Sequence, residues 1–211
     1  MVVNGVDFGR IVAGIGWPGA GNQHPGAVVI VGEKKYPPIG STDYEYQVLE
    51  IREAPDTMAL LDACAEVCPE YKAEPIVART EWDPFWPTEG RWSEDREKRG
   101  LRRIFIQHAV YSKSDGNIRY HIENLKRLFQ RRSEHEKPRL CGSTKEIDAK
   151  LKTLFGNVIP KDGVEEFIDL HHPAVAALGY AAAYLVEYPP QEEDDAFSDY
   201  DGDTICETTG Y

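Results

Sequence analysis

Gly26-Ala-Val-Val-Ile-Val-Gly32 is the stretch that decides the fold. Its unbroken apolar run between two glycines predicts a strand buried on both faces. Upstream, residues 2–8 alternate weakly and are rich in valine, which predicts a first strand. Residues 14–22 lie between the two and are rich in glycine, so we expect a hairpin connection or a mobile loop there. A phosphate-binding loop is not expected, because no Gly-Lys-Ser/Thr follows.

Strand and helix patterns continue downstream of this pair. Residues 44–52 predict a third strand, and Pro55-Asp56 opens a helix with an apolar stripe. Further strands are expected at 75–80 and 103–109, and further helices at 115–132, after Ser143-Thr-Lys-Glu146, and at 174–187. This order predicts an α/β fold with a mixed sheet of five or more strands. A three-strand antiparallel meander would precede parallel strands, with helices on both faces.

Length and charge divide the chain into two parts. Its 211 residues are 41% hydrophobic, which suits one domain over residues 1–187. Residues 188–211 hold eight acids and no Lys or Arg, and we expect an acidic, disordered tail. The net charge is −12, yet residues 89–132 hold twelve Lys/Arg against six Asp/Glu. A locally basic body with an acidic tail is compatible with binding a polyanion on one face.

Other totals limit the class of protein. The sequence has no apolar run of about 20 residues and no signal peptide, so we expect no membrane contact and a cytoplasmic location. Cys64 and Cys68 share the apolar stripe with leucines and a valine, and we expect buried core thiols. Cysteine spacing typical of a zinc site is absent.

Three groups of residues could carry chemistry. Asp7 lies inside a valine-rich strand, where a buried carboxylate needs a partner such as a metal ion. Glu81, with Asp83 as the alternative, follows the strand at 75–80, and ligands collect at the carboxyl ends of such strands. His171-His172 precedes the last helix and offers two imidazoles. Each is also compatible with a plain surface residue.

The order of several motifs resembles the RNase H-like nuclease domain of the large terminase subunits of tailed phages. The motifs are Gly5-Val-Asp-Phe-Gly9 with the glycine-rich hairpin, Ile76-Val-Ala-Arg-Thr-Glu81, Gly100-Leu-Arg-Arg-Ile-Phe-Ile106 with the following helix, Arg139-Leu-Cys-Gly-Ser-Thr-Lys-Glu-Ile147, and His171-His-Pro-Ala-Val-Ala-Ala-Leu-Gly-Tyr180. The resemblance covers residues 2–187. It implies metal-dependent endonuclease cleavage of double-stranded DNA during viral genome packaging.

The resemblance also implies a site with two divalent cations, Mn²⁺ or Mg²⁺, about 3.5–4 Å apart. Asp7 would bridge both ions, Glu81 would bind one, and His171 or His172 would supply the third ligand, with His172 favoured. The chain departs from the family here, because His172, Pro173 and Ala176 stand where the pattern has acids. Fewer carboxylates would favour manganese.

Basic residues would contact DNA phosphates beside the metals. They are Arg79, Arg91, Arg96, Lys98, Arg99, Arg102 and Arg103. The other interpretation is a solvated helix face in which Glu94, Asp95 and Glu97 pair with them. The aromatic residues Trp82, Phe85, Trp86 and Trp92 are more typical of loop packing than of base stacking.

Partners and alternatives follow from the resemblance. Double-stranded DNA, a terminase ATPase domain, the small terminase subunit and the portal or procapsid would be partners in the host cytoplasm. No Walker A motif is present, so we expect an excised or separately encoded nuclease. The alternative is a catalytically weakened RNase H-like domain that binds DNA or docks on a packaging motor. An actin-like nucleotide binder is a third interpretation, but the length does not provide its duplicated domain.

Overall fold

The computed structural model describes eight segments of the chain. They are residues 1–18, 24–35, 45–78, 86–98, 104–108, 118–129, 139–155 and 172–188. The predicted tail, from residue 189 onward, lies outside them.

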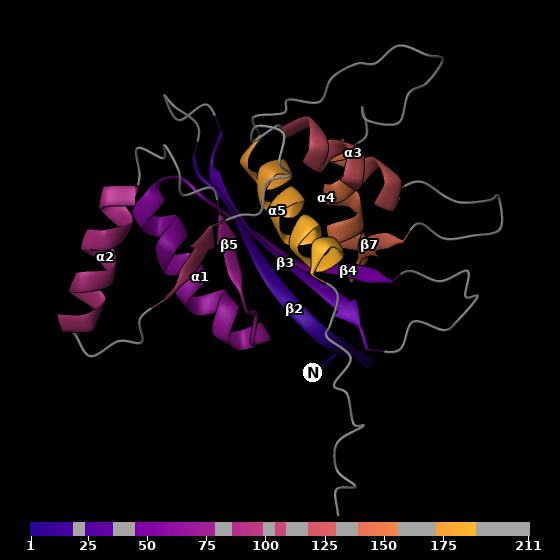
Figure 1. Cartoon of the computed structure of the whole chain (residues 1–211), viewed down its shortest axis with the longest axis horizontal. Coiled ribbons are helices and arrows are strands. Elements are labelled where there is room, and N and C mark those ends of the chain that lie inside the picture. Colours follow the sequence, from indigo (N-terminus) through magenta and orange to yellow (C-terminus); the bar gives the residue numbers. More distant parts are fainter. Residues whose placement is uncertain are drawn as a thin grey trace, which may run out of the picture.

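One mixed sheet organises the described segments (Figure 1). Its strands are β1 (Val2–Val3), β2 (Val6–Gly16), β3 (Gly26–Lys34), β4 (Tyr46–Ala54), β5 (Ile76–Ala78), β6 (Ile106–His108) and β7 (Leu140–Gly142). The order is β6-β5-β2-β3-β4-β7, with β1 paired to β2. The strands β2, β3 and β4 form an antiparallel meander, whereas β5, β6 and β7 add in parallel. This is the meander followed by parallel strands that the sequence predicts for an RNase H-like domain.

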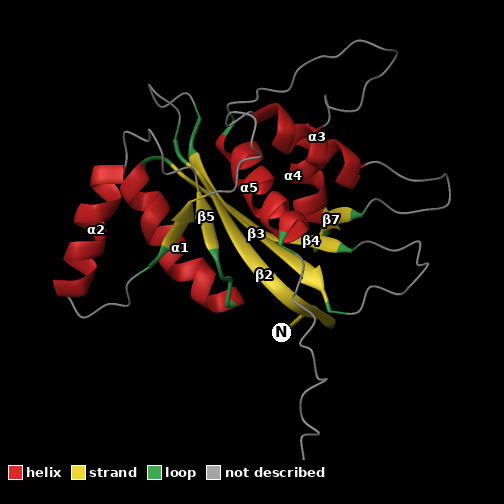
Figure 2. Ribbon diagram, in the orientation of Figure 1, coloured by secondary structure: helices red, strands yellow, loops and turns green. Residues whose placement is uncertain are grey.

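Helices cover both faces of the sheet, as predicted (Figure 2). They are α1 (Thr57–Tyr71), α2 (Trp86–Lys98), α3 (Ile118–Phe129), α4 (Lys145–Phe155) and α5 (Pro173–Glu187). One apolar core joins α3, α4 and α5 to the face that carries Val12 and Val29. The other joins α1 and α2 to the face that carries Ile15 and Val28. The central strands are therefore apolar on both sides.

The length of β2 differs from the prediction. The strand begins at Val6 and runs to Gly16, so residues 14–16 belong to the sheet and not to a loop. Before it, Asn4 and Gly5 adopt positive φ angles of 50° and 78° in the turn between β1 and β2. Asn-Gly is a strong hairpin signal. Asp7 therefore lies at the start of the central strand, opposite Val2, and not at a strand's end.

Other differences concern short elements. The strand expected at residues 103–109 corresponds to β6, which is shorter. The strand β7 was not expected. Thr144, and not Ser143, caps α4, because its hydroxyl oxygen accepts a hydrogen bond from the Ile147 N–H at 3.2 Å. The β7 segment, Leu140-Cys-Gly142, has only two apolar residues in a row, which is too short a run to predict a strand.

The helix α1 confirms two expectations. The Asp56 carboxylate caps it by accepting a hydrogen bond from the Ala59 N–H at 2.9 Å. Cys64 and Cys68 are buried and free, as predicted. A hydrogen bond that the protonated Cys64 thiol makes with Cys68, together with burial, raises the pKa of the Cys64 thiol well above its usual value. These thiols are part of the core.

Arg10 on β2 fastens the last turn of α5. Its guanidinium binds the Glu33 carboxylate at 2.6 Å and donates to the carbonyl of Leu185 at 2.8 Å. It also donates to the carbonyl of Tyr188. A cation at a helix C-terminus satisfies carbonyls that lack partners within the helix. Residue 188, where the acidic segment begins, is thus anchored to the central strand.

Among the residues that the structure describes, no helix is both long and apolar enough to cross a bilayer.

Candidate functional site

Asp7 is a surface carboxylate at the first turn of the sheet. Its side chain is 46% exposed, and Oδ1 lies 3.3 Å from the N-terminal nitrogen of Met1. The Met1 nitrogen also donates to the carbonyl of Phe8 at 2.7 Å. Asp7 is therefore nearly half exposed to solvent, and it does not need a metal ion to offset burial.

His172 caps the N-terminus of α5. Its Nδ1 accepts a hydrogen bond from the Ala174 N–H at 3.2 Å, and Pro173 occupies the first turn. Because the Nδ1 lone pair faces this N–H, the neutral ring carries its proton on Nε2. A metal ion needs a free lone pair on the ring. The ring in this state is thus a helix cap and an N–H donor.

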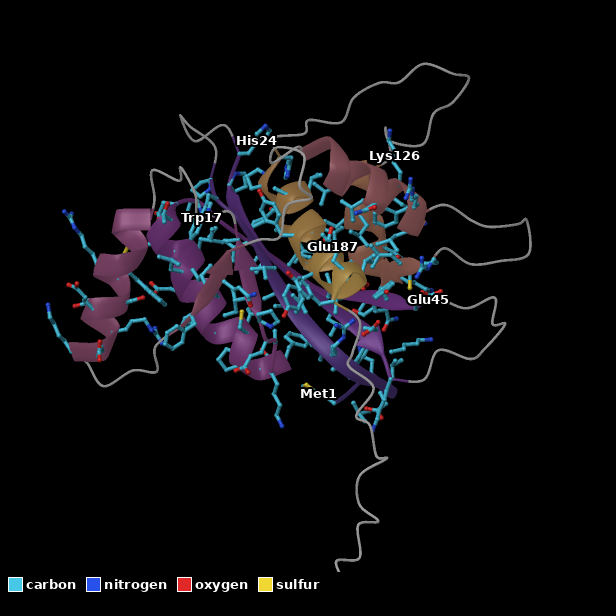
Figure 3. The ribbon with its side chains drawn as sticks, in the orientation of Figure 1. Met1, Trp17, His24, Glu45, Lys126 and Glu187 are labelled. Atoms are coloured by element: carbon cyan, nitrogen blue, oxygen red, sulfur yellow. The ribbon has the colours of Figure 1, made fainter. Side chains whose placement is uncertain are left out.

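Asp7 and His172 lie at opposite ends of β2. The helix α5 runs antiparallel to this strand, with Pro173 against Gly16 and Leu185 against Arg10. Gly16 is nine positions after Asp7, which is about 30 Å at the rise of a strand. Figure 3 shows Met1, the partner of Asp7, and His24, the neighbour of His172, at opposite ends of the molecule. The structure does not bring Asp7 and His172 together, because the strand continues past Asp7.

Two glycines bring the backbone of α5 against the central strand. A Cβ atom on Gly16 would lie 1.9 Å from the carbonyl oxygen of Pro173, and one on Gly14 equally close to that of Ala177. Both contacts are with backbone, which cannot turn aside as a side chain can. At the edge that holds His172, β2 therefore has no room for a carboxylate on the face that α5 covers.

His24 is the site residue that the sequence did not reveal. It lies just before β3, and its ring centroid is 4.9 Å from that of His172, with the planes tilted by 45°. The two imidazoles come from elements that are far apart in the sequence. A single histidine before a strand carries no periodic signal, and only the glycine-rich segment before it marked this edge.

The remaining predicted site residues divide into two groups. Glu81, its alternative Asp83, His171, Arg79, Arg99, Arg102 and Arg103 lie outside the described residues. Arg91, Arg96 and Lys98 lie on α2, with Arg91 and Lys98 exposed.

Trp92 is buried between α2 and α1. Its Nε1 donates to Asp62 at 2.9 Å, and the Arg96 guanidinium carbon lies 4.7 Å from the centre of its ring. Packing between two helices, and neither the expected loop packing nor base stacking, explains this aromatic residue. The stacked Arg96 also holds one basic side chain in a defined position on α2.

The described residues do not fit the pair of cations that the sequence resemblance implies. Within those segments, no group of three or more His, Cys, Asp or Glu side chains is placed to hold a metal ion. Asp7 is remote, the β2 positions at the His172 edge are glycines, and His172 uses Nδ1 as a cap. Glu81 and His171 lie outside the described residues, so this comparison does not include them.

Replacing the His172 cap has an expected cost. His172→Ala removes the acceptor of the Ala174 N–H and should lower the free energy of unfolding by about 1 kcal/mol, whereas His172→Asn should keep most of it. Urea unfolding followed by circular dichroism measures both. Equal stability of the alanine and wild-type proteins would contradict the capping role.

Similarity to known proteins is found in structure and not in sequence. No family model matches the sequence, and no curated protein matches it either. In structure, the chain is similar to the nuclease domain of g2p, the large terminase of the bacteriophage SPP1, which was crystallised with bound Mn. The similarity covers 86% of this chain and 88% of that one, at 16% identity and a TM-score of 0.48. That neighbour is the nuclease domain of a large terminase, the kind of domain that the sequence motifs of this chain resemble.

Proposed function

We propose that this chain is a DNA-binding domain of a viral packaging machine that keeps the RNase H-like fold without a cleavage centre on its central strand. One observation carries the proposal. The backbone of α5 occupies the space that a side chain at Gly14 or Gly16 would need. In an open α/β sheet, ligands collect beyond the carboxyl ends of the parallel strands. Two-metal hydrolysis needs a carboxylate there to bridge the ions, and β2 supplies none.

Binding without cleavage is supported by the charges on α2. Arg91 and Lys98 are exposed, and Arg96 is held against Trp92. Contacts of arginine and lysine with phosphates give affinity without reading bases, which suits a domain that meets DNA of any sequence. The acids Glu94, Asp95 and Glu97 lie on the same helix and limit the net charge. We propose that Arg79, Arg99, Arg102 and Arg103 extend this surface.

The competing function is metal-dependent cleavage of double-stranded DNA. The approach of His24 to His172 favours it, because two imidazoles meet at the edge toward which β5 runs. In this case Glu81 and His171 would complete a site for Mn²⁺ or Mg²⁺ and Asp7 would have no part. Whether the domain binds or cleaves DNA, its proposed partners are the ATPase domain, the small terminase subunit and the portal.

Two assays on the full chain separate these functions. Filter binding of linear duplex DNA should show salt-dependent retention, and supercoiled plasmid should stay intact in Mn²⁺. Arg91→Gln with Lys98→Gln should lower the slope of log affinity against log salt by about 2, since each phosphate contact contributes roughly 0.9. The matched control is Lys145→Gln with Lys152→Gln, which removes two exposed cations from α4 on the other side of the sheet.

The result that overturns the proposal is also specific. Plasmid cutting in Mn²⁺ that Glu81→Gln abolishes and Asp7→Ala preserves would establish the competing nuclease. Absence of DNA retention at low salt would reject both functions.

A further inference from the structure

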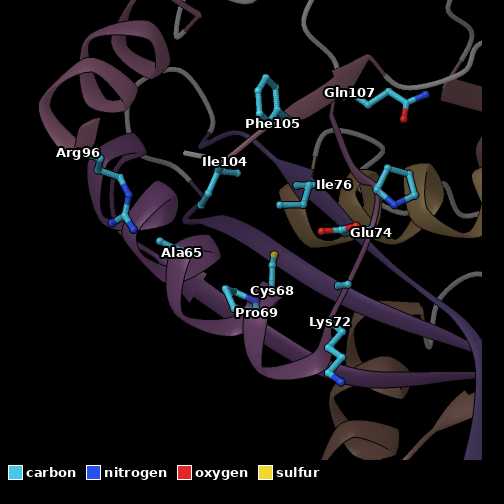
Figure 4. A pocket seen from close by; sticks show the side chains of 12 residues that line it. Ala65, Cys68, Pro69, Lys72, Glu74, Ile76, Arg96, Ile104, Phe105 and Gln107 are labelled. Atoms are coloured by element: carbon cyan, nitrogen blue, oxygen red, sulfur yellow. The ribbon is translucent and has the colours of Figure 1, made fainter. Parts of the chain in front are cut away.

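A groove opens on the side of the molecule that α1 and α2 cover. Its volume is about 870 Å³, and most of its lining is apolar. The lining comes from the end of α1, the segment leading into β5, the α2 helix and the segment around β6 (Figure 4). Cys68, Ile76 and Ile104 belong to the apolar part. The groove lies apart from the edge that holds His172, because it surrounds the start of β5 and not its end.

Two cations flank this apolar lining. Figure 4 shows Lys72 and Arg96 on opposite sides of the groove, with Cys68 between them. Lys72 ends α1 in a left-handed conformation, and its N–H donates to the Pro69 carbonyl at 3.2 Å. Among the described residues that line the groove, Glu74 is the one carboxylate. A ligand with acidic and apolar groups together would match these walls.

The rim of the groove offers two further contacts. Phe105 is 75% exposed although its ring is large and apolar. It directly precedes β6, the outermost strand on that side of the described sheet. An edge strand presents backbone N–H and C=O groups to an extended peptide, and pockets beside it receive alternate side chains. These features favour an extended peptide over a compact small molecule.

The chain itself contains a segment of this chemistry. Residues 189–211 hold eight acids and no Lys, Arg or His, and they include Phe197, Tyr200 and Ile205. The segment begins at the end of the sheet where β5 starts, on the face that α5 covers, whereas the groove lies on the face that α1 and α2 cover. Arg10 holds the carbonyl of Tyr188, and the next residue on β2, Ile11, accepts a hydrogen bond from the Glu74 N–H at 2.9 Å. Twenty-three residues can extend up to about 75 Å, so their length does not restrict this contact.

We propose that the groove binds the acidic C-terminal segment, residues 189–211, of the same chain. Tethering places the segment at a high effective concentration, which offsets the small number of charges in the groove. The acids pair with Lys72 and Arg96, and the aromatic residues cover the apolar lining and Phe105. Arg96 is also among the expected phosphate contacts, so the segment and DNA compete for it; this last consequence rests on the proposed function.

Paramagnetic relaxation in the full chain tests this contact without DNA. A nitroxide is attached at Cys206, with Cys141→Ser to remove the partly exposed Cys141 thiol and with buried Cys64 and Cys68 left unchanged. The amide signals of Lys72, Glu74, Phe105 and Gln107 should lose most of their intensity relative to the reduced label. Those of His24 and Ala174, at the opposite end of the strands, should keep it.

Charge variants then identify the cause of the broadening. Lys72→Glu with Arg96→Glu should restore the groove signals, and so should high salt, which screens the ion pairs. Lys98→Glu, on the same helix but outside the groove, should leave the broadening unchanged. Uniform broadening, broadening elsewhere, or broadening that survives the double variant would overturn the proposal. So would broadening of an unlabelled, ¹⁵N-enriched chain mixed with a spin-labelled one, because a second copy would then be the occupant.

Discussion

Gly16→Ala is expected to lower the free energy of unfolding by about 3 kcal/mol or more, at the upper end of the range for overpacked cores. The added Cβ would lie 1.9 Å from the carbonyl oxygen of Pro173 and 2.8 Å from its Cα atom. The first turn of α5 would have to move off the sheet and carry the His172 cap with it. Urea unfolding followed by circular dichroism at 222 nm measures the change. Gly16→Asp should be at least as destabilising, and it should not create a nuclease.

The matched control is Gly90→Ala on α2. A Cβ there meets nothing within 4 Å, and alanine is favoured over glycine inside a helix by up to about 1 kcal/mol. This variant should therefore be as stable as the wild type or more so. A Gly16→Ala protein with an unchanged unfolding midpoint would show that α5 does not lie against β2 as described, and the argument against a carboxylate there would fail.

Arg10→Met is expected to cost about 2–3 kcal/mol. It removes hydrogen bonds from a charged donor, which contribute more than neutral ones. It also leaves Glu33, whose side chain is only 20% exposed, without its 2.6 Å partner. The two carbonyls at the end of α5 lose their cation at the same time. Thermal and urea unfolding should both show the loss, and hydrogen exchange of the last turn of α5 should accelerate.

Arg52→Met provides the comparison for Arg10. Arg52 is 46% exposed and lies 3.5 Å from Glu50 and 3.8 Å from Glu66. Exposed ion pairs of this kind contribute between 0 and about 1 kcal/mol. If both variants lose the same small amount, Arg10 does not fasten α5 to the central strand.

The architecture could be predicted because its main elements have strong periods. The apolar run at 26–32, the stripe of α1 and the nearly continuous apolar surface of α5 each match an observed element. The extent of β2 could not be predicted, because the sequence of a strand buried on both faces does not alternate between apolar and polar residues. Gly14 and Gly16 also look like turn residues, and their role appears only when α5 lies against them.

The site was less predictable than the fold because it depends on register. Assigning the first strand to residues 2–8 put Asp7 at a strand's end, whereas the Asn4-Gly5 turn makes it the second residue of β2. Because β2 extends to Gly16, the carboxylate of Asp7 lies at the opposite end of the strand from the edge where it was expected. The meeting of His24 with His172 joins residues 148 positions apart, and no local pattern encodes it.

The direction of α5 determines which end of the protein stays exposed when the protein is attached to a surface through the end of this helix. The helix has 15 residues, which is about 22 Å of axis, and it carries the chain from the imidazole pair to the guanidinium of Arg10. A biotin or a fluorescent protein attached directly at residue 188 would join the molecule through the end that holds Met1. Immobilised in this way, the protein would present His24 and His172 to solution, so the orientation suits surface-based measurements of ligands at that edge.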